Sequence, residues 1–229
     1  MNSENNETHP QQATRILIYF SIIHTQTDMG ALSESLRRAT VRKLGEKAWR
    51  RQVNSIERMW SQIEQVIGGL AISYEKVRLY QDGLPVCGRE ADIVRELAKA
   101  GSRNHQLLLR LMEKGATVMG TECSELLVEE YELVKQMLNA PNARTAEGTD
   151  SELKSLSDSL LTRRDQYIAD RINSTLGSGE TGILFLGMLH SLGGMLDENI
   201  QIIYPIHRPF DRGGQGDDRK RRPGSDRRR

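Results

Sequence analysis

Four titratable residues stand at the ends of short apolar or β-rich segments of this sequence. His24 closes the segment "RILIYFSIIH" and His190 closes "GILFLGMLH", whereas Asp82 and Glu122 follow shorter stretches. Imidazole and carboxylate groups can act as general acid and base, and together they form a nitrogen and oxygen ligand set for a divalent metal such as Mn²⁺ or Zn²⁺. These residue types predict either acid–base chemistry or a metal site.

Five segments have the composition and length of strands. Residues 16–23 form a continuous β-rich run, which is typical of a strand covered on both faces of a parallel sheet. Residues 72–85 alternate apolar and polar side chains and close on the turn pair Asp82-Gly83. We expect the other strands within residues 114–122, 182–190 and 199–206.

Helical patterns separate these strands. From Trp49 to Ile67 the apolar residues recur at steps of three and four, which places them on one face of a helix. Further helices are expected after Gly30, over 90–99, 104–113 and 124–138, and from an N-cap at Asp150 or Ser151 through Ile172. The alternation predicts an α/β fold: a largely parallel sheet of about five strands with helices on both faces.

In a parallel sheet all strands end at the same edge, and ligands collect there. His24, Asp82, Glu122 and His190 would then lie close together, as a metal ligand set or as proton donors and acceptors.

Short motifs around these residues suggest a family. "GMLH", Gly187 to His190, matches the G-x-x-H motif of the superfamily that joins erythromycin-esterase-like, ChaN-like and TraB/Tiki-type proteins, and "SIIH", Ser21 to His24, stands in the place of its first motif. The segment 163–172 resembles the arginine-bearing helix before the second motif, and Glu122 in "GTE" is similar in placement to an internal acidic residue. The resemblance spans residues 15–206, and it departs from the family at Ser21, where the motif has glycine.

This resemblance implies a cytoplasmic, hydrolase-like α/β protein, metal-dependent in some members, with His24, Glu122, Arg164 and His190 in its site. In such a site Arg164 would hold an oxyanion, a carboxylate or a phosphate in a fork of N–H donors. Members of the superfamily cleave esters, act as metal-dependent peptidases or bind haem, so the fold alone does not select a substrate. A small molecule or a peptide is the expected substrate.

Each of these residues also has a purely structural interpretation. A histidine after a strand can hydrogen-bond a loop, Asp82 can belong to a turn, Glu122 can cap the helix that starts at Ser124, and Arg164 can be solvated. His105 is expected to cap a helix or to contact solvent. The sequence contains no phosphate-binding loop, no G-x-S-x-G elbow and no C-x-x-C pair.

Composition divides the chain into one domain of residues 15–207 between two disordered ends, residues 1–14 and 208–229. The net charge is +1, but nine Lys/Arg and four Asp/Glu fall in 208–229, which leaves the remainder at about −4. Two cysteines are too few for a disulfide framework, and no segment is apolar and long enough to span a membrane, so we expect a cytoplasmic protein.

The alternative is a binding or interaction protein without catalytic activity. The helix stripe of residues 49–67 could face a partner, although a place in the core is expected from its short length. The basic tail would give weak, salt-dependent contact with nucleic acid or an acidic partner. The sequence leaves the oligomeric state open.

Overall fold

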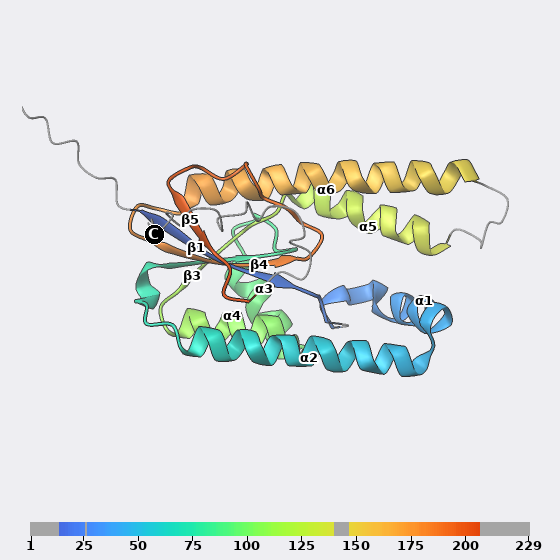
Figure 1. The fold of residues 1–229 in the computed structure, drawn as a ribbon, viewed down its shortest axis with the longest axis horizontal. Helices are drawn as coiled ribbons and strands as arrows, with labels where there is room; N and C mark the ends of the chain where they lie inside the picture. The colour runs from blue at the N-terminus through green and yellow to red at the C-terminus, as the bar shows by residue number, and fades with distance from the viewer. Residues whose placement is uncertain (1–13, 26, 140–146, 207–229) are drawn as a thin grey trace, which may run out of the picture.

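The computed structural model describes residues 14–206, apart from 26 and 140–146. Within these residues a five-stranded parallel sheet has the strand order β3-β2-β4-β1-β5. Its strands are β1 (Arg15–Ile22), β2 (Val77–Gln81), β3 (Thr117–Met119), β4 (Thr181–Gly187) and β5 (Ile200–Ile203). The predicted α/β fold, with a largely parallel sheet of about five strands and helices on both faces, is confirmed (Figure 1).

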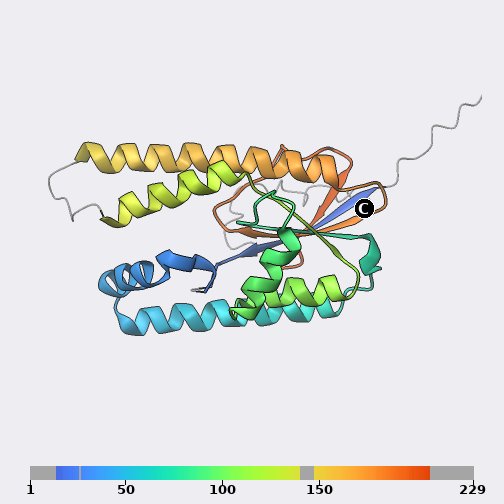
Figure 2. The same cartoon turned by 180° about the vertical axis from the view of Figure 1, so that it is seen from behind.

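Helices cover both faces of the sheet, as the two opposite views show (Figures 1 and 2). One layer contains α2 (Glu46–Gly68), α3 (Glu90–Lys99) and α4 (Arg103–Glu113), and the other contains α6 (Glu147–Thr175) with α5 (Ser124–Asn139) packed on it. A 3₁₀ turn, η1 (Thr27–Leu32), and α1 (Ser33–Leu44) connect β1 to α2, and a shorter 3₁₀ turn, η2 (Tyr74–Lys76), precedes β2.

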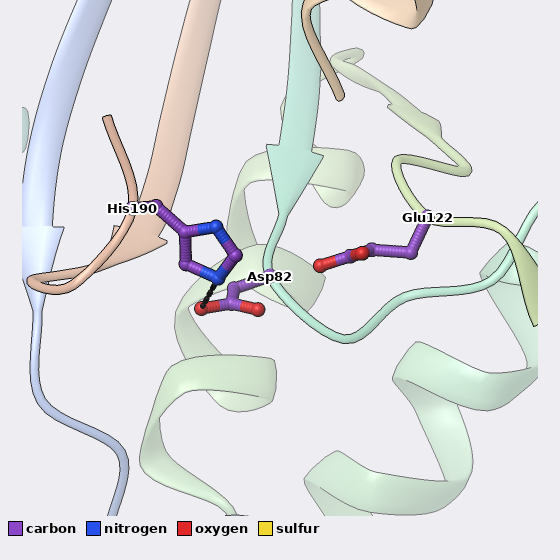
Figure 3. A group of neighbouring side chains, drawn as sticks. All are labelled: Asp82, Glu122 and His190. Carbon is purple, nitrogen blue, oxygen red and sulfur yellow. Dashed lines mark ion pairs between the residues drawn. The ribbon is translucent and has the colours of Figure 1, made fainter. Parts of the chain in front are cut away.

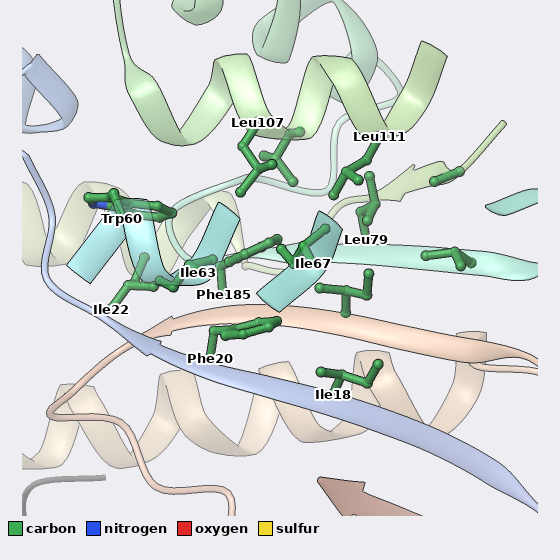
Figure 4. Packing of buried hydrophobic residues seen from close by; sticks show 14 of the residues in the cluster. Ile18, Phe20, Ile22, Trp60, Ile63, Ile67, Leu79, Leu107, Leu111 and Phe185 are labelled. Atoms are coloured by element: carbon green, nitrogen blue, oxygen red, sulfur yellow. The ribbon is translucent and has the colours of Figure 1, made fainter. Parts of the chain in front are cut away.

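The larger core lies between the sheet and α2. Trp60, Ile63 and Ile67 of α2 pack against Phe20 of β1 and Phe185 of β4 (Figure 4). From Ile56 to Ile67 the apolar stripe of α2 therefore belongs to the core, as its spacing predicted. Trp49 and Val53, at the start of the stripe, are half-buried and line a smaller cavity instead. Alternate residues of β1 face the other layer, where Leu17 and Tyr19 pack with α6. From Ile16 to Phe20 the strand has no charged residue, because both of its faces are covered.

Two details differ from the sequence prediction. The helical region after Gly30 is broken at Gly45, whose positive φ of 81° separates α1 from α2. The prediction that Asp150 or Ser151 caps the last long helix is wrong, because α6 already begins at Glu147. Residues 1–13 and 208–229, the predicted disordered ends apart from Thr14, lie outside the described residues. Among the described helices, none is long and apolar enough to cross a membrane.

The position of β4 decides which residues meet. It pairs with β1 on one side and with β2 on the other, although it comes last but one in the sequence. The loop that follows β4 therefore lies between the loops that follow β1 and β2. This order brings His24, Asp82 and His190 together at the carboxyl edge of the sheet.

Gly120 lets the loop after β3 approach the loop after β2. A Cβ at this position would lie 2.6 Å from the Cα of Val86 and 2.9 Å from the carbonyl oxygen of Pro85, both of them backbone atoms. We expect Gly120→Ala to lower the free energy of unfolding by about 1–3 kcal/mol through overpacking. Urea unfolding would measure the loss.

Gly68→Ala is the matched control, because a Cβ at Gly68 meets nothing within 4 Å at the end of α2. This variant should be neutral or more stable by up to about 1 kcal/mol, since alanine favours helix more than glycine does. Equal effects of the two substitutions would contradict the close approach at Gly120.

Candidate active site at the carboxyl edge of the sheet

A cavity of about 910 Å³ lies at the carboxyl edge of the sheet. Its polar lining includes His24, Asp82, Arg164 and His190, which come from the ends of β1, β2 and β4 and from α6. The volume is in the range of small-molecule sites, and the charged groups are concentrated against otherwise aliphatic walls.

Both predicted histidines contact the same carboxylate. His24 Nε2 donates a hydrogen bond to Asp82 Oδ2 at 3.0 Å, and His190 Nε2 lies 3.6 Å from that same oxygen (Figure 3 shows His190 and Asp82). Asp82 is buried, so its turn position also places a charge inside the protein. The two histidine segments, distant in sequence, therefore contribute to one site.

Arg164 connects Asp82 to Glu122. Its Nη2 donates to Asp82 Oδ1 at 2.9 Å and to Glu122 Oε1 at 2.6 Å, and its Nε donates to Glu122 Oε2 at 3.0 Å. The third nitrogen, Nη1, donates to Glu130 of α5. Only 4% of the Arg164 side chain is exposed and Glu122 is fully buried, so neither the solvated interpretation of Arg164 nor the simple cap interpretation of Glu122 fits.

The guanidinium of Arg164 is already committed to protein carboxylates. All three of its nitrogens donate to acidic side chains of the chain itself. It therefore presents no free fork of donors, and its direct effect is to offset the negative charges buried around it.

Asp165 is a site residue that the sequence prediction missed. His190 Nδ1 donates to Asp165 Oδ1 at 2.6 Å, and the other carboxylate oxygen accepts from the backbone N–H of Ser191 at 3.0 Å. This pair fixes the ring so that Nε2 points to Asp82. Neighbouring residues of a helix point about 100° apart, so a helical pattern that directs Arg164 to the site gives no signal for Asp165.

The charges of the site shift the pKa values of its groups. Burial lowers the pKa of His190, but the hydrogen bond to Asp165 and the charge of Asp82 outweigh it, so the net shift is upward; His24 is raised by Asp82 in the same way. Burial alone would raise the pKa of the Asp82 carboxyl, yet the histidines and Arg164 hold it well below its usual range. For Glu122 burial outweighs the shared Arg164, and its pKa is raised.

Three of the predicted metal ligands form a compact group. Asp82, Glu122 and His190 are buried, and each offers a ligand atom within 4.8 Å of the others, close enough to hold a metal ion. His24, predicted as a fourth ligand, is not in this group of described residues. Its side chain is 31% exposed and reaches the group through Asp82.

The glycine of "GMLH" has a visible structural reason. A Cβ at Gly187 would lie 2.7 Å from Asp82 Oδ2, and the Gly187 N–H donates to that oxygen at 2.8 Å. Ser21, the departure from the motif, pairs with Leu186 rather than with Gly187, so the two histidine segments are offset by one residue.

No protein-family model, curated protein or solved structure matches this chain. The resemblance to the esterase-like superfamily stays a prediction.

The prediction that His105 caps a helix or contacts solvent is wrong, because Ser102 is the N-cap of α4 and His105 is buried. His105 lines the cavity, where its Nδ1 lies 2.6 Å from Ser102 Oγ. Ser102 Oγ donates its one proton to Asp28 Oδ1 at 2.5 Å, so His105 Nδ1 must be the donor to Ser102. This chain of hydrogen bonds attaches η1 to α4 at the cavity wall.

Removal of Arg164 should expose the charge balance of the site. We expect Arg164→Leu to lower the free energy of unfolding by about 3–5 kcal/mol at pH 7, because Asp82 and Glu122 stay buried without their counter-charge. The loss should shrink as the pH falls toward 5, since Glu122, with its raised pKa, takes up a proton and ceases to need Arg164. Urea unfolding at both pH values would test this.

The neighbouring Arg163 provides the control. It is half exposed and pairs with Glu129 at 2.7 Å on the surface, so Arg163→Leu should cost less than about 1 kcal/mol and show little pH dependence. If both arginine variants lose the same stability, Arg164 does not offset the buried charges of Asp82 and Glu122 as described.

The Asp165 pair should be visible in a histidine titration. In metal-free protein with EDTA, we expect NMR to place the pKa of His190 above 6.5 in the wild type and lower in Asp165→Asn, while Asp170→Asn, an exposed position on the same helix, leaves it unchanged. Because the folded state binds the proton more tightly, the stability due to His190 is complete below pH 6.5 and is lost as the pH rises through the folded pKa. An unshifted His190 in the wild type would contradict the pairing.

Proposed function

We propose that this chain is a hydrolase whose site at the carboxyl edge of the sheet works with a divalent metal, Mn²⁺ or Zn²⁺. The observation that carries the proposal is the group of Asp82, Glu122 and His190, buried together beside a cavity of ligand size. A mixed imidazole and carboxylate set is one that such metals accept, and it leaves coordination positions for water and substrate. The motif resemblance to esterase-like and TraB/Tiki-type proteins supports the same class.

Each residue of the site has a role in this proposal. A bound cation would polarise a carbonyl and lower the pKa of a water molecule. Asp82, Glu122 and His190 would hold it, while Asp165 orients His190 through Nδ1. Asp82 and Glu122 are in turn fixed by Arg164.

His24 is the group best placed to move protons. It is partly exposed, lines the cavity and stays outside the compact ligand group. The Asp82 carboxylate supports its protonated form, so His24 can donate a proton to a leaving group and accept one from water. The substrate would be an ester or an amide, whose carbonyl carbon gains the water oxygen as the bond to the leaving group breaks.

Two alternatives give different results in the same assays. The histidines and carboxylates could exchange protons without a metal, or the cavity could bind a ligand without turnover. The predicted contact of the basic tail with nucleic acid concerns residues 208–229, which lie outside the described residues, and the predicted cytoplasmic location remains a proposal.

Metal binding should stabilise the folded protein. At a free Mn²⁺ or Zn²⁺ concentration of 100 times Kd, a ligand of the folded state adds about 2.7 kcal/mol, which raises Tm by several degrees. We expect this rise in the wild type, its reversal by EDTA and its loss in His190→Ala and Asp82→Asn. His105→Ala, which alters a cavity histidine outside the ligand group, should keep it.

Activity on a panel of nitrophenyl esters and peptide anilides would complete the test. His24→Ala should keep the metal response and lose hydrolysis, because His24 moves protons and is not in the ligand group. Hydrolysis that is insensitive to EDTA would overturn the proposed metal dependence and favour acid–base catalysis. A protein with neither metal response nor hydrolysis would not be the proposed enzyme.

A further inference from the structure

Helix α5 carries two apolar faces, and only one of them packs in a core. Leu126 and Leu133 pack on Leu160 of α6. The stripe of Leu127, Tyr131 and Val134, which the sequence spacing places on one face, lines the cavity instead. Apolar side chains that face a cavity are stabilised when an apolar ligand removes them from water.

The opposite wall of the cavity is also aliphatic. Ile93 and Leu97 of α3 and Leu32 of η1 line it. Leu189, which lies next to His190, belongs to the lining and is 83% exposed, so the apolar surface continues to where the cavity meets solvent. The site at the sheet edge is therefore the polar end of an apolar space.

Among the described residues, the lining offers an anionic ligand no free arginine or lysine. Of the described residues that line the cavity, Arg164 is the only arginine or lysine, and its nitrogens already donate to Asp82, Glu122 and Glu130. Asp28 and Glu130 add negative charge to the wall. A carboxylate or phosphate in the cavity would find no uncommitted guanidinium or ammonium group among these residues.

Gln81 supplies a specific acceptor. It lines the cavity at the end of β2 and is 1% exposed. Its Nε2 donates to the carbonyl oxygen of Asp82 at 3.0 Å, which fixes the orientation of the amide, and its Oε1 has no hydrogen-bond partner in the described structure. Buried acceptors are rarely left unsatisfied, so a ligand with an N–H donor would complete this one.

We propose that the cavity takes a neutral acyl amide, with its aliphatic chain against α3 and α5 and its N–H on Gln81 Oε1. This proposal names a substrate class for the proposed hydrolase. Cleavage of the amide rests on the hydrolase function, but its binding does not. In that step the water oxygen bonds to the carbonyl carbon, the C–N bond breaks and the leaving nitrogen takes up a proton.

Binding of simple amides tests the proposal without turnover. Calorimetric titrations would compare hexanamide, octanamide, octanoate and methyl octanoate on the full chain in EDTA, so that no bound metal can attract the carboxylate. We expect octanamide to bind, with Kd falling about fourfold for each added methylene, and to bind at least tenfold more tightly than octanoate or methyl octanoate. The carboxylate meets Asp28 and Glu130 without an uncommitted arginine or lysine, and the ester lacks the N–H donor.

Matched variants locate the two contacts. Val134→Asp should weaken octanamide binding at least tenfold, whereas Val128→Asp, the same change at a 63% exposed site of the same helix, should not. Gln81→Met should lower the affinity for octanamide to the affinity for methyl octanoate. If Val134→Asp does not fold by circular dichroism, Val134→Trp should remove the chain-length dependence by filling the cavity.

The outcomes separate this proposal from the hydrolase function. Octanamide binding with these dependences supports the ligand class even if no amide is cleaved. Absence of octanamide binding, no effect of chain length, or octanoate binding as tightly as octanamide would overturn it. Hydrolysis of short esters without any chain-length preference would support the hydrolase function but would overturn the proposal that the cavity binds an acyl amide.

Discussion

The structure of the site depends on how one buried guanidinium is shared among acidic side chains. Arg164 reaches Asp82, Glu122 and Glu130 from the middle of α6, and each contact joins α6 to a different segment of the chain. Without this charge the two buried carboxylates would repel each other in a medium that solvates them poorly. The same network explains why α5, α6 and the loops after β2 and β3 occupy fixed positions around the cavity.

Around this network the residues differ in exposure, and exposure separates their tasks. His190 is buried, held by Asp165 and directed at Asp82, as expected of a positioned ligand. His24 contacts the same Asp82 oxygen but remains open to the cavity. Two histidines that look equivalent in their motifs are thus suited to different chemistry, because one ends the central strand and the other ends a strand beside it.

The predicted and observed structures agree where one short segment decides the outcome. The apolar residues of the strand at 16–23 and those of the stripe from Ile56 to Ile67 carry a periodicity that matches their packing in the core. The predicted start of the last long helix at Asp150 or Ser151 was wrong, because a helix can extend past a residue that is able to cap it. The spacing of Leu127, Tyr131 and Val134 places them on one face of α5, but spacing alone does not distinguish a core from a cavity wall.

By itself the sequence determined the fold class and four residues, His24, Asp82, Glu122 and His190, that a parallel sheet must bring to one edge, because the carboxyl ends of its strands point the same way. Only the tertiary structure decided the rest. The insertion of β4 between β1 and β2 set which side chains touch, and burial set the demand for counter-charge that Arg164 meets and the place of Asp165. These depend on contacts between segments far apart in the chain, for which local patterns carry no signal.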